Sequence, residues 1–191
     1  MSFKPLKTVT SRTLVLSTTN IDTDQIMPAK FLSMTTKAGL GEHVFANLRY
    51  GSDGELTDHE LNSEDGKACE ILVAGHNFGC GSSREHAVWA LKEYGFRAVI
   101  AESFGEIFYN NCVRNGILCV VLNKAEIASL GKEVMIDLPA QTINGISFQI
   151  GEGDKDMLVL GLDPIALTLR DKDEIDAFFA RDQVVRPWVH G

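Results

Sequence analysis

The stretch ILVAGHNFGCGSSREHAVWALKEYG, residues 71–95, decides the architecture of this chain. Residues 71–74 form a short, wholly apolar run, which is typical of a strand buried on both faces. Residues 75–81 contain three glycines and predict a turn whose backbone N–H groups can come close to a small ligand. Residues 84–94 have apolar side chains at helical spacing and predict a helix that ends at Gly95. The stretch therefore indicates a strand, a glycine turn and a helix in succession.

Segments before and after this stretch add further strands and helices. Strands are predicted at 12–17, 97–101, 117–122 and 134–138, and helices at 104–115 and 124–130. Strands joined by helices favour right-handed crossovers and a parallel sheet. Asn144-Gly145, between two apolar runs, indicates a hairpin. The sequence predicts an α/β fold with a mostly parallel central sheet and an added antiparallel hairpin.

Other segments give weaker or more local signals. Ser103 with Glu106 predicts a capping box at the start of the second helix. The expectations for the remaining segments are a helix within 40–50, either a strand or a helix at 157–162, an amphipathic helix over 171–181 and a packed Trp188 near the C-terminus.

Composition excludes several classes of function. The chain has 191 residues and a formal net charge of −8, which argues against a nucleic-acid-binding protein. The first residues do not resemble a signal peptide, and no apolar run is long enough to span a membrane, so we expect a cytoplasmic protein. The four cysteines form no CxxC pair, which argues against a zinc site or an iron–sulfur site built from such pairs. Cys112 and Cys119 are expected in the core, and Cys80 as a filler of the glycine turn.

The glycine turn does not fit three common catalytic or nucleotide-binding motifs. The dinucleotide fingerprint requires a glycine where Arg84 stands, and a P-loop requires a lysine followed by Ser or Thr. The nucleophile elbow G-x-S-x-G is absent, and His86 is expected on the helix surface. Binding of a simple phosphate at the helix start remains an alternative.

Ser82, Ser83 and Arg84 are the candidate catalytic group. A hydroxyl at a helix N-terminus and beside a guanidinium can be stabilised as an alkoxide, which is a strong base. The guanidinium can bind a carboxylate with two parallel hydrogen bonds. These residue types suggest proton abstraction from a small carboxylic acid. The alternative is that Ser82 only caps the helix and Arg84 pairs with an acidic side chain.

Three segments in the same order resemble a known family: GCGSSREHA, the loop NIDTDQIMP and the helix SFGEIFYNNCVRNG. They are similar to the small subunits of 3-isopropylmalate dehydratase, the swivelling domain of the aconitase family. The resemblance covers nearly the whole chain. It implies a three-layer β/β/α domain over residues 1–191, with a helical extension from about residue 163 to 191.

The resemblance also assigns roles to residues. In the family the first serine of the motif is the base, which falls on Ser82. The second serine and the arginine bind substrate carboxylate, which falls on Ser83 and Arg84. An aspartate of the T-D-x-I loop belongs to the active site, which falls on Asp24 and implies that it orients Arg84 or Ser82.

The segment after that loop contacts the variable group of the substrate in related subunits. It falls on Phe31, Leu32 and Ser33. The homoaconitase type commonly has a basic residue in the third of these places, and Ser33 departs from that pattern. Phe31 and Leu32 suit an isopropyl group, which favours isopropylmalate.

The family reaction needs a [4Fe–4S] cluster whose open iron acts as a Lewis acid. This sequence offers no set of three cysteines at suitable spacing, so the resemblance implies a cluster on a separate large subunit. The expected function is a small subunit that isomerises 2-isopropylmalate to 3-isopropylmalate in leucine biosynthesis, active only with that partner. The alternatives are a subunit acting on homoaconitate, citraconate or a dimethylmalate, and a non-catalytic anion-binding or regulatory module.

Overall fold

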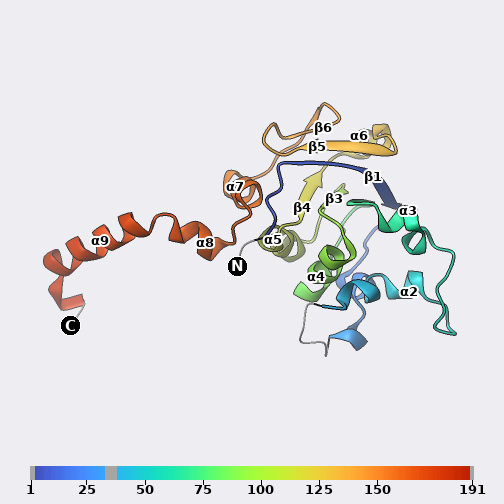
Figure 1. Ribbon diagram of the computed structural model, residues 1–191, viewed down its shortest axis with the longest axis horizontal. Coiled ribbons are helices and arrows are strands. Elements are labelled where there is room, and N and C mark those ends of the chain that lie inside the picture. Colours follow the sequence, from blue (N-terminus) through green and yellow to red (C-terminus); the bar gives the residue numbers. More distant parts are fainter. Residues whose placement is uncertain (1–2, 33–37, 190–191) are drawn as a thin grey trace.

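The computed structural model describes residues 3–32 and 38–189. Within them the strands form one seven-stranded sheet, ordered β4-β3-β2-β1-β5-β6-β7 (Figure 1). The strands are β1 Thr8–Leu16, β2 Ile71–Ala74, β3 Ala98–Ala101, β4 Leu118–Val121, β5 Glu133–Asp137, β6 Thr142–Ile143 and β7 Ile146–Ser147. The α-helices are α1 Thr23–Ile26, α2 Ala46–Arg49, α3 Glu64–Lys67, α4 Glu85–Tyr94, α5 Glu106–Asn115, α6 Lys124–Ser129, α7 Glu152–Leu160, α8 Pro164–Leu169 and α9 Lys172–Val185. Short 3₁₀ helices lie at Ala29–Phe31, Leu40–His43, Glu60–Asn62 and Pro187–Val189.

Strand β1 joins the parallel and antiparallel parts of the sheet. Residues 13–16 pair in parallel with β2, and the parallel pairing continues from β2 to β3 and from β3 to β4. Residues 8–12 pair antiparallel with β5, which is followed by the β6–β7 hairpin. The sequence predicted β1 only from residue 12. The earlier half is polar on its exposed side and buries Val9 alone among residues 8–11, so its strand pattern is weak.

The parallel strands are the middle layer of three. Alternate side chains of each strand point to opposite faces. One face, which includes Leu72 and Val99, packs against α4 and α5. The other face, which includes Ile71 and Ile100, packs against buried residues of β5 and β6 and against Leu158 of α7. The sheet therefore curls so that its antiparallel part covers its parallel part, as expected for a β/β/α arrangement (Figure 1).

The structure decides one open local expectation and corrects two others. Residues 157–162 belong largely to helix α7. Residues 40–50 form two short helices rather than one, because Phe45 between them has a φ of 50° and turns the chain. Helix α5 has Gly105 as its N-cap without a side-chain hydrogen bond, so the predicted capping box is wrong. The Ser103 hydroxyl instead accepts from the Asn77 backbone N–H, 2.8 Å away, and contacts the His76 ring.

The C-terminal helices extend away from the sheet (Figure 1). Helix α8 buries no residue, and α9 buries only Asp182. Trp188 is 75% exposed, so the expectation that it packs against the fold is wrong. Among residues 3–32 and 38–189, none of the helices combines the length and the apolar character needed to cross a membrane.

Candidate active site

The loops after β1, β2 and β3 lie side by side at the carboxyl end of the parallel strands. The Gly79 N–H donates to the Ile21 carbonyl at 2.7 Å, and the Thr23 N–H donates to the Cys80 carbonyl at 3.0 Å. On the other side, the Phe78 N–H donates to the Ser103 carbonyl at 3.0 Å. These bonds continue the sheet pattern beyond the strands. They bring the NIDTDQIMP loop against the glycine turn, although about 60 residues separate the two in sequence.

Gly79 lets the glycine turn pack closely against helix α5. Its φ is +72°, and a Cβ at this position would lie 2.2 Å from Cγ of Phe108. A side chain here would therefore be strained by the backbone and would also clash with the aromatic ring. The sequence suggested that the glycines admit a ligand. At Gly79 the close neighbour is instead the Phe108 side chain of this protein.

Ser82 and Ser83 lie at the end of the glycine turn and are both exposed. Helix α4 starts at Glu85, and its N-cap is Arg84, with no side-chain hydrogen bond to the cap. The alternative in which Ser82 caps the helix is therefore wrong. Ser82 precedes the helix by three residues and Ser83 by two, and both residues are exposed.

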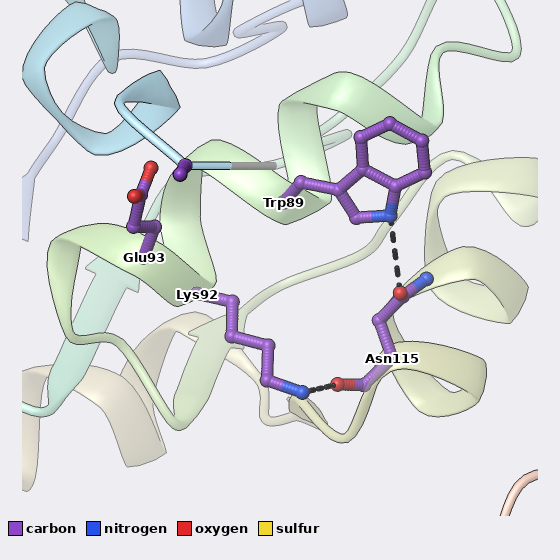
Figure 2. A pocket seen from close by; sticks show the side chains of 5 residues that line it. Trp89, Lys92, Glu93 and Asn115 are labelled. Atoms are coloured by element: carbon purple, nitrogen blue, oxygen red, sulfur yellow. Dashed lines mark hydrogen bonds between the residues drawn. The ribbon is translucent and has the colours of Figure 1, made fainter. Parts of the chain in front are cut away.

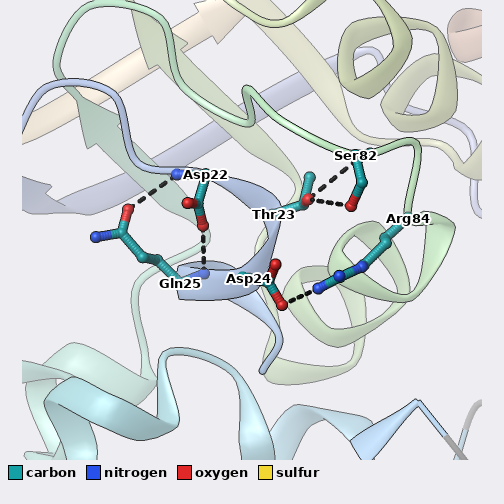
Figure 3. A network of polar contacts seen from close by, with 6 residues as sticks. All are labelled: Asp22, Thr23, Asp24, Gln25, Ser82 and Arg84. Atoms are coloured by element: carbon teal, nitrogen blue, oxygen red, sulfur yellow. Dashed lines mark hydrogen bonds and ion pairs between the residues drawn. The ribbon is translucent and has the colours of Figure 1, made fainter. Parts of the chain in front are cut away.

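Asp24 and Arg84 form an ion pair beside Ser82 (Figure 3). The Arg84 Nη1 donates to the Asp24 Oδ1. Asp24 is held by helix α1, whose N-terminus is fixed by a capping box between Asp22 and Gln25. The Asp22 carboxylate accepts from the Gln25 N–H at 2.7 Å, and the Gln25 side chain accepts from the Asp22 N–H at 2.9 Å. The ion pair occupies one N–H at the edge of the guanidinium. Within residues 3–32 and 38–189 its other donors have no side-chain partner, so they can bind an anion.

Thr23 is a further site residue, and the sequence pattern does not predict it. The residue is only 1% exposed, and its Oγ1 lies 3.0 Å from the Ser82 carbonyl oxygen and 3.2 Å from Ser82 Oγ. A threonine in a polar loop usually bonds to nearby backbone, so no local pattern distinguishes it. The one available signal was its position next to Asp24 in the loop that carries the resemblance.

Phe31 and Leu32 are half-buried, and Ser33 lies outside the described residues. The Phe31 ring stacks on the His43 ring with 3.9 Å between centroids and 7° between planes. Both rings line a cavity of about 400 Å³, which Lys30 and Tyr50 also border. Ser82, Arg84 and Asp24 are not among the lining residues of this cavity. The structure thus brings Ser82, Arg84 and Asp24 together and leaves Phe31 on a neighbouring surface.

A cavity of about 380 Å³ lies along α4, away from its N-terminus (Figure 2). The Asn115 side chain accepts from Trp89 Nε1 at 3.1 Å, and the Asn115 carbonyl accepts from Lys92 at 2.5 Å. Glu93 accepts from the Gly39 and Gly41 N–H groups at 2.6 and 2.7 Å. These contacts join α4 to α5 and to the chain around residue 40. They stabilise the helix that follows the candidate active site.

The cysteines do not provide a set of cluster ligands in residues 3–32 and 38–189, where no group of three His, Cys, Asp or Glu side chains is suited to a metal. Cys112 and Cys119 are buried in the core, as predicted. Burial raises the pKa of the Cys112 thiol, which keeps it protonated. Cys80 is partly exposed in the glycine turn.

Comparison with known proteins identifies the family. Residues 3–125 match the aconitase C-terminal domain, and residues 165–191 match the C-terminal domain of the 3-isopropylmalate dehydratase small subunit. The chain is 48% identical over 190 residues to a 3-isopropylmalate dehydratase small subunit from Halalkalibacterium halodurans, covering 93% of this chain and 98% of that protein. It is 40% identical to the corresponding subunit from Leptospira interrogans, with 98% of each chain covered.

A solved structure agrees with these relatives. The crystal structure of a 3-isopropylmalate dehydratase from Methanocaldococcus jannaschii superposes with a TM-score of 0.67 at 31% identity. The match covers 89% of this chain and 99% of the archaeal chain. The chain therefore belongs to the aconitase family, among the small subunits of 3-isopropylmalate dehydratase.

Proposed function

We propose that this chain is the small subunit of a heteromeric hydro-lyase that converts 2-isopropylmalate into 3-isopropylmalate in leucine biosynthesis, by removing and restoring water. The observation that carries the proposal is the exposed residue Ser82 beside the Asp24–Arg84 ion pair. The relatives named above support the reaction class. The chain acts as one swivelling domain over residues 1–191, with the segment from about residue 163 as its helical extension.

Ser82 is the proposed base. Its ionised hydroxyl takes the proton from the carbon beside a substrate carboxylate, and the same oxygen returns the proton during rehydration. Ser83 and Arg84 hold the carboxylate next to it. A guanidinium paired on one side with Asp24 keeps a fixed orientation, which places its remaining N–H donors for bidentate binding.

The substrate's branched group is proposed to contact the segment of Phe31, Leu32 and Ser33. Phe31 and Leu32 are partly exposed, which leaves apolar surface for an isopropyl group. Because Phe31 borders a separate cavity, this part of the proposal needs its own test. The assay compares 2-isopropylmalate with homoaconitate, citraconate and dimethylmalate. A preference for 2-isopropylmalate supports the assignment, and a larger kcat/KM for one of the other acids overturns it.

The cysteines described above do not fit a [4Fe–4S] cluster, and we derive no step through that group from this chain. We propose that the family's cluster is carried by a separate large subunit, that the complete active site forms where the two chains meet, and that the enzyme works in the cytoplasm. Co-expression with the large subunit tests this. Iron and acid-labile sulfide are expected with the large chain, and their retention by the purified small chain contradicts the proposal.

Replacement of Ser82 by alanine tests the catalytic role. Loss of the base is expected to lower kcat by about 10²- to 10⁴-fold, while the complex with the large subunit still assembles. The measurement is turnover of 2-isopropylmalate together with size-exclusion chromatography of the co-purified subunits. Ser129→Ala is a matched control, because Ser129 is exposed and its hydroxyl donates to the nearby Glu126 carbonyl of α6. Full turnover by Ser82→Ala would favour the non-catalytic module instead.

A further inference from the structure

The Thr23 hydroxyl is positioned against Ser82 by the fold rather than by local sequence. Thr23 is the first residue of α1, and its N–H donates to the Cys80 carbonyl at 3.0 Å. Its buried side chain then points to Ser82, 59 residues away in sequence, as Figure 3 shows. The Thr23 Oγ1 is within hydrogen-bond distance of two atoms of that residue, its carbonyl oxygen and its Oγ.

A threonine hydroxyl has a single proton to donate. The Ser82 carbonyl can only accept, so the contact of 3.0 Å uses the Thr23 proton. In that arrangement the contact of 3.2 Å has Ser82 Oγ as the donor and Thr23 Oγ1 as the acceptor. The serine proton then points at Thr23. This describes Ser82 in its neutral, resting form.

An ionised Ser82 has no proton to give, which changes the pairing. We propose that Thr23 is a positioning residue that turns its hydroxyl proton from the Ser82 carbonyl to the Ser82 alkoxide and so stabilises the active base. The inference rests on the function proposed above, in which Ser82 is that base. A hydrogen bond to an ionised acceptor is roughly twice as strong as one between neutral groups, which favours rotation of the Thr23 hydroxyl toward the alkoxide.

Rotation of the Thr23 hydroxyl costs little, because the Ser82 carbonyl oxygen has a second hydrogen-bond donor. The Arg84 N–H lies 2.8 Å from the same carbonyl oxygen, so that oxygen keeps a partner when Thr23 moves its proton. Burial of Thr23 strengthens this stabilisation of the alkoxide. The hydroxyl proton moves between two fixed acceptors, and bulk water does not compete for it.

Protons balance through the cycle. Ser82 starts as an alkoxide, with its proton released to water. When it takes the substrate proton, the carbon–hydrogen bond breaks and the serine O–H bond forms. The electron pair of the broken bond forms the carbon–carbon double bond as hydroxide leaves the neighbouring carbon. Thr23 then turns its proton back to the carbonyl and accepts from the new Ser82 O–H. In rehydration, hydroxide adds to one carbon of the double bond, Ser82 returns the proton to the other carbon and becomes an alkoxide again, and Thr23 remains a neutral hydroxyl throughout.

The test removes the hydroxyl while keeping the buried volume. In the complex with the large subunit, Thr23→Val is expected to lower kcat by about 10- to 100-fold, as loss of a hydrogen bond to a charged group predicts, with KM nearly unchanged. The acidic limb of the pH profile of kcat is expected to move to higher pH, because the charged base is less stabilised. Thr23→Ser keeps the donor and is expected to restore both properties.

The matched control is Thr57→Val, which removes another partly buried hydroxyl that donates to a backbone carbonyl, that of Leu48 at 2.9 Å, in a loop that does not contact Ser82. If Thr23→Val does not assemble, Thr23→Cys replaces it, because a thiol is a weaker donor and is expected to produce the same shift.

Two outcomes overturn the inference. An unchanged pH profile in Thr23→Val, with or without a lower melting temperature, means that Thr23 only packs the loops together. A Thr23→Ser variant as impaired as Thr23→Val means that the hydroxyl is not the active feature. Retained turnover in Ser82→Ala would instead overturn the proposed function, so the two failures are distinguishable.

Discussion

Among single residues, the ion pair between Asp24 and Arg84 shows how a contact of small energetic value can matter for chemistry. The side chains are 51% and 23% exposed, so the pair contributes less than about 1 kcal/mol to folding. Its effect is directional, because Asp24 holds one N–H of the guanidinium and so restrains its orientation. The pair also illustrates why one alternative from the sequence was incomplete: Arg84 does pair with an acidic residue, and this pairing is compatible with carboxylate binding.

Asp24→Asn is expected to raise KM by about 10-fold, because the guanidinium loses its charged partner and its fixed orientation. The free energy of unfolding is expected to change by less than about 1 kcal/mol. Steady-state kinetics and urea denaturation measure the two quantities. Asp176→Asn is the matched control, since Asp176 forms an exposed ion pair with Lys172 on α9. A large loss of stability with an unchanged KM would contradict a positioning role.

At the scale of elements, the site depends on loops that are joined to one another. The turn after β2 bonds to the loop before α1 on one side and to the turn after β3 on the other. The sequence predicted β2 within residue limits that match the structure and α4 within one residue, because their apolar periodicity is strong. It could not predict which loops pair, since the bonding partners are backbone groups that leave no mark in side-chain pattern.

Gly79→Ala is expected to destabilise the fold by about 2–4 kcal/mol, from the positive φ and from displacement of the Phe108 ring. Gly54→Ala is a control that separates the two causes, because Gly54 has a φ of +83° but a Cβ added there would have nothing within 4 Å. It is expected to lose only about 1–2 kcal/mol. Urea denaturation measures both. Equal losses of stability in the two variants would show that the Phe108 ring does not add to the cost of a side chain at position 79.

For the whole molecule, the body and the C-terminal helices differ in how they are stabilised. The body has two buried clusters, one on each face of the parallel strands. Helices α8 and α9 and the turn that follows them expose large apolar side chains, including Ile165 at 71%, Val184 at 81% and Trp188 at 75%. The amphipathic pattern predicted a helix at 171–181 correctly but not its exposure. Such a pattern reports one apolar face and does not report whether this chain covers it.

Removal of residues 171–191 is expected to change the melting temperature of the body by less than about 2 °C, because α9 adds almost no buried apolar surface. Removal of residues 152–191 is the contrasting variant. It deletes α7, which contains the fully buried Leu158. The Leu158 carbonyl accepts from the Leu6 N–H at 2.9 Å. Circular dichroism during heating measures both. A large drop for the shorter deletion would show that α9 supports the body.

The sequence alone determined the alternation of strand and helix, the hairpin at Asn144-Gly145 and the serine motif that carries the family resemblance. These features are local, and side-chain periodicity or turn chemistry encodes them directly. Only the tertiary structure decided that β1 is shared between two partners, that Trp188 is exposed and that Thr23 contacts Ser82. Each of these depends on segments far apart in the chain, whose approach is set by the packing of the whole domain and not by any one segment.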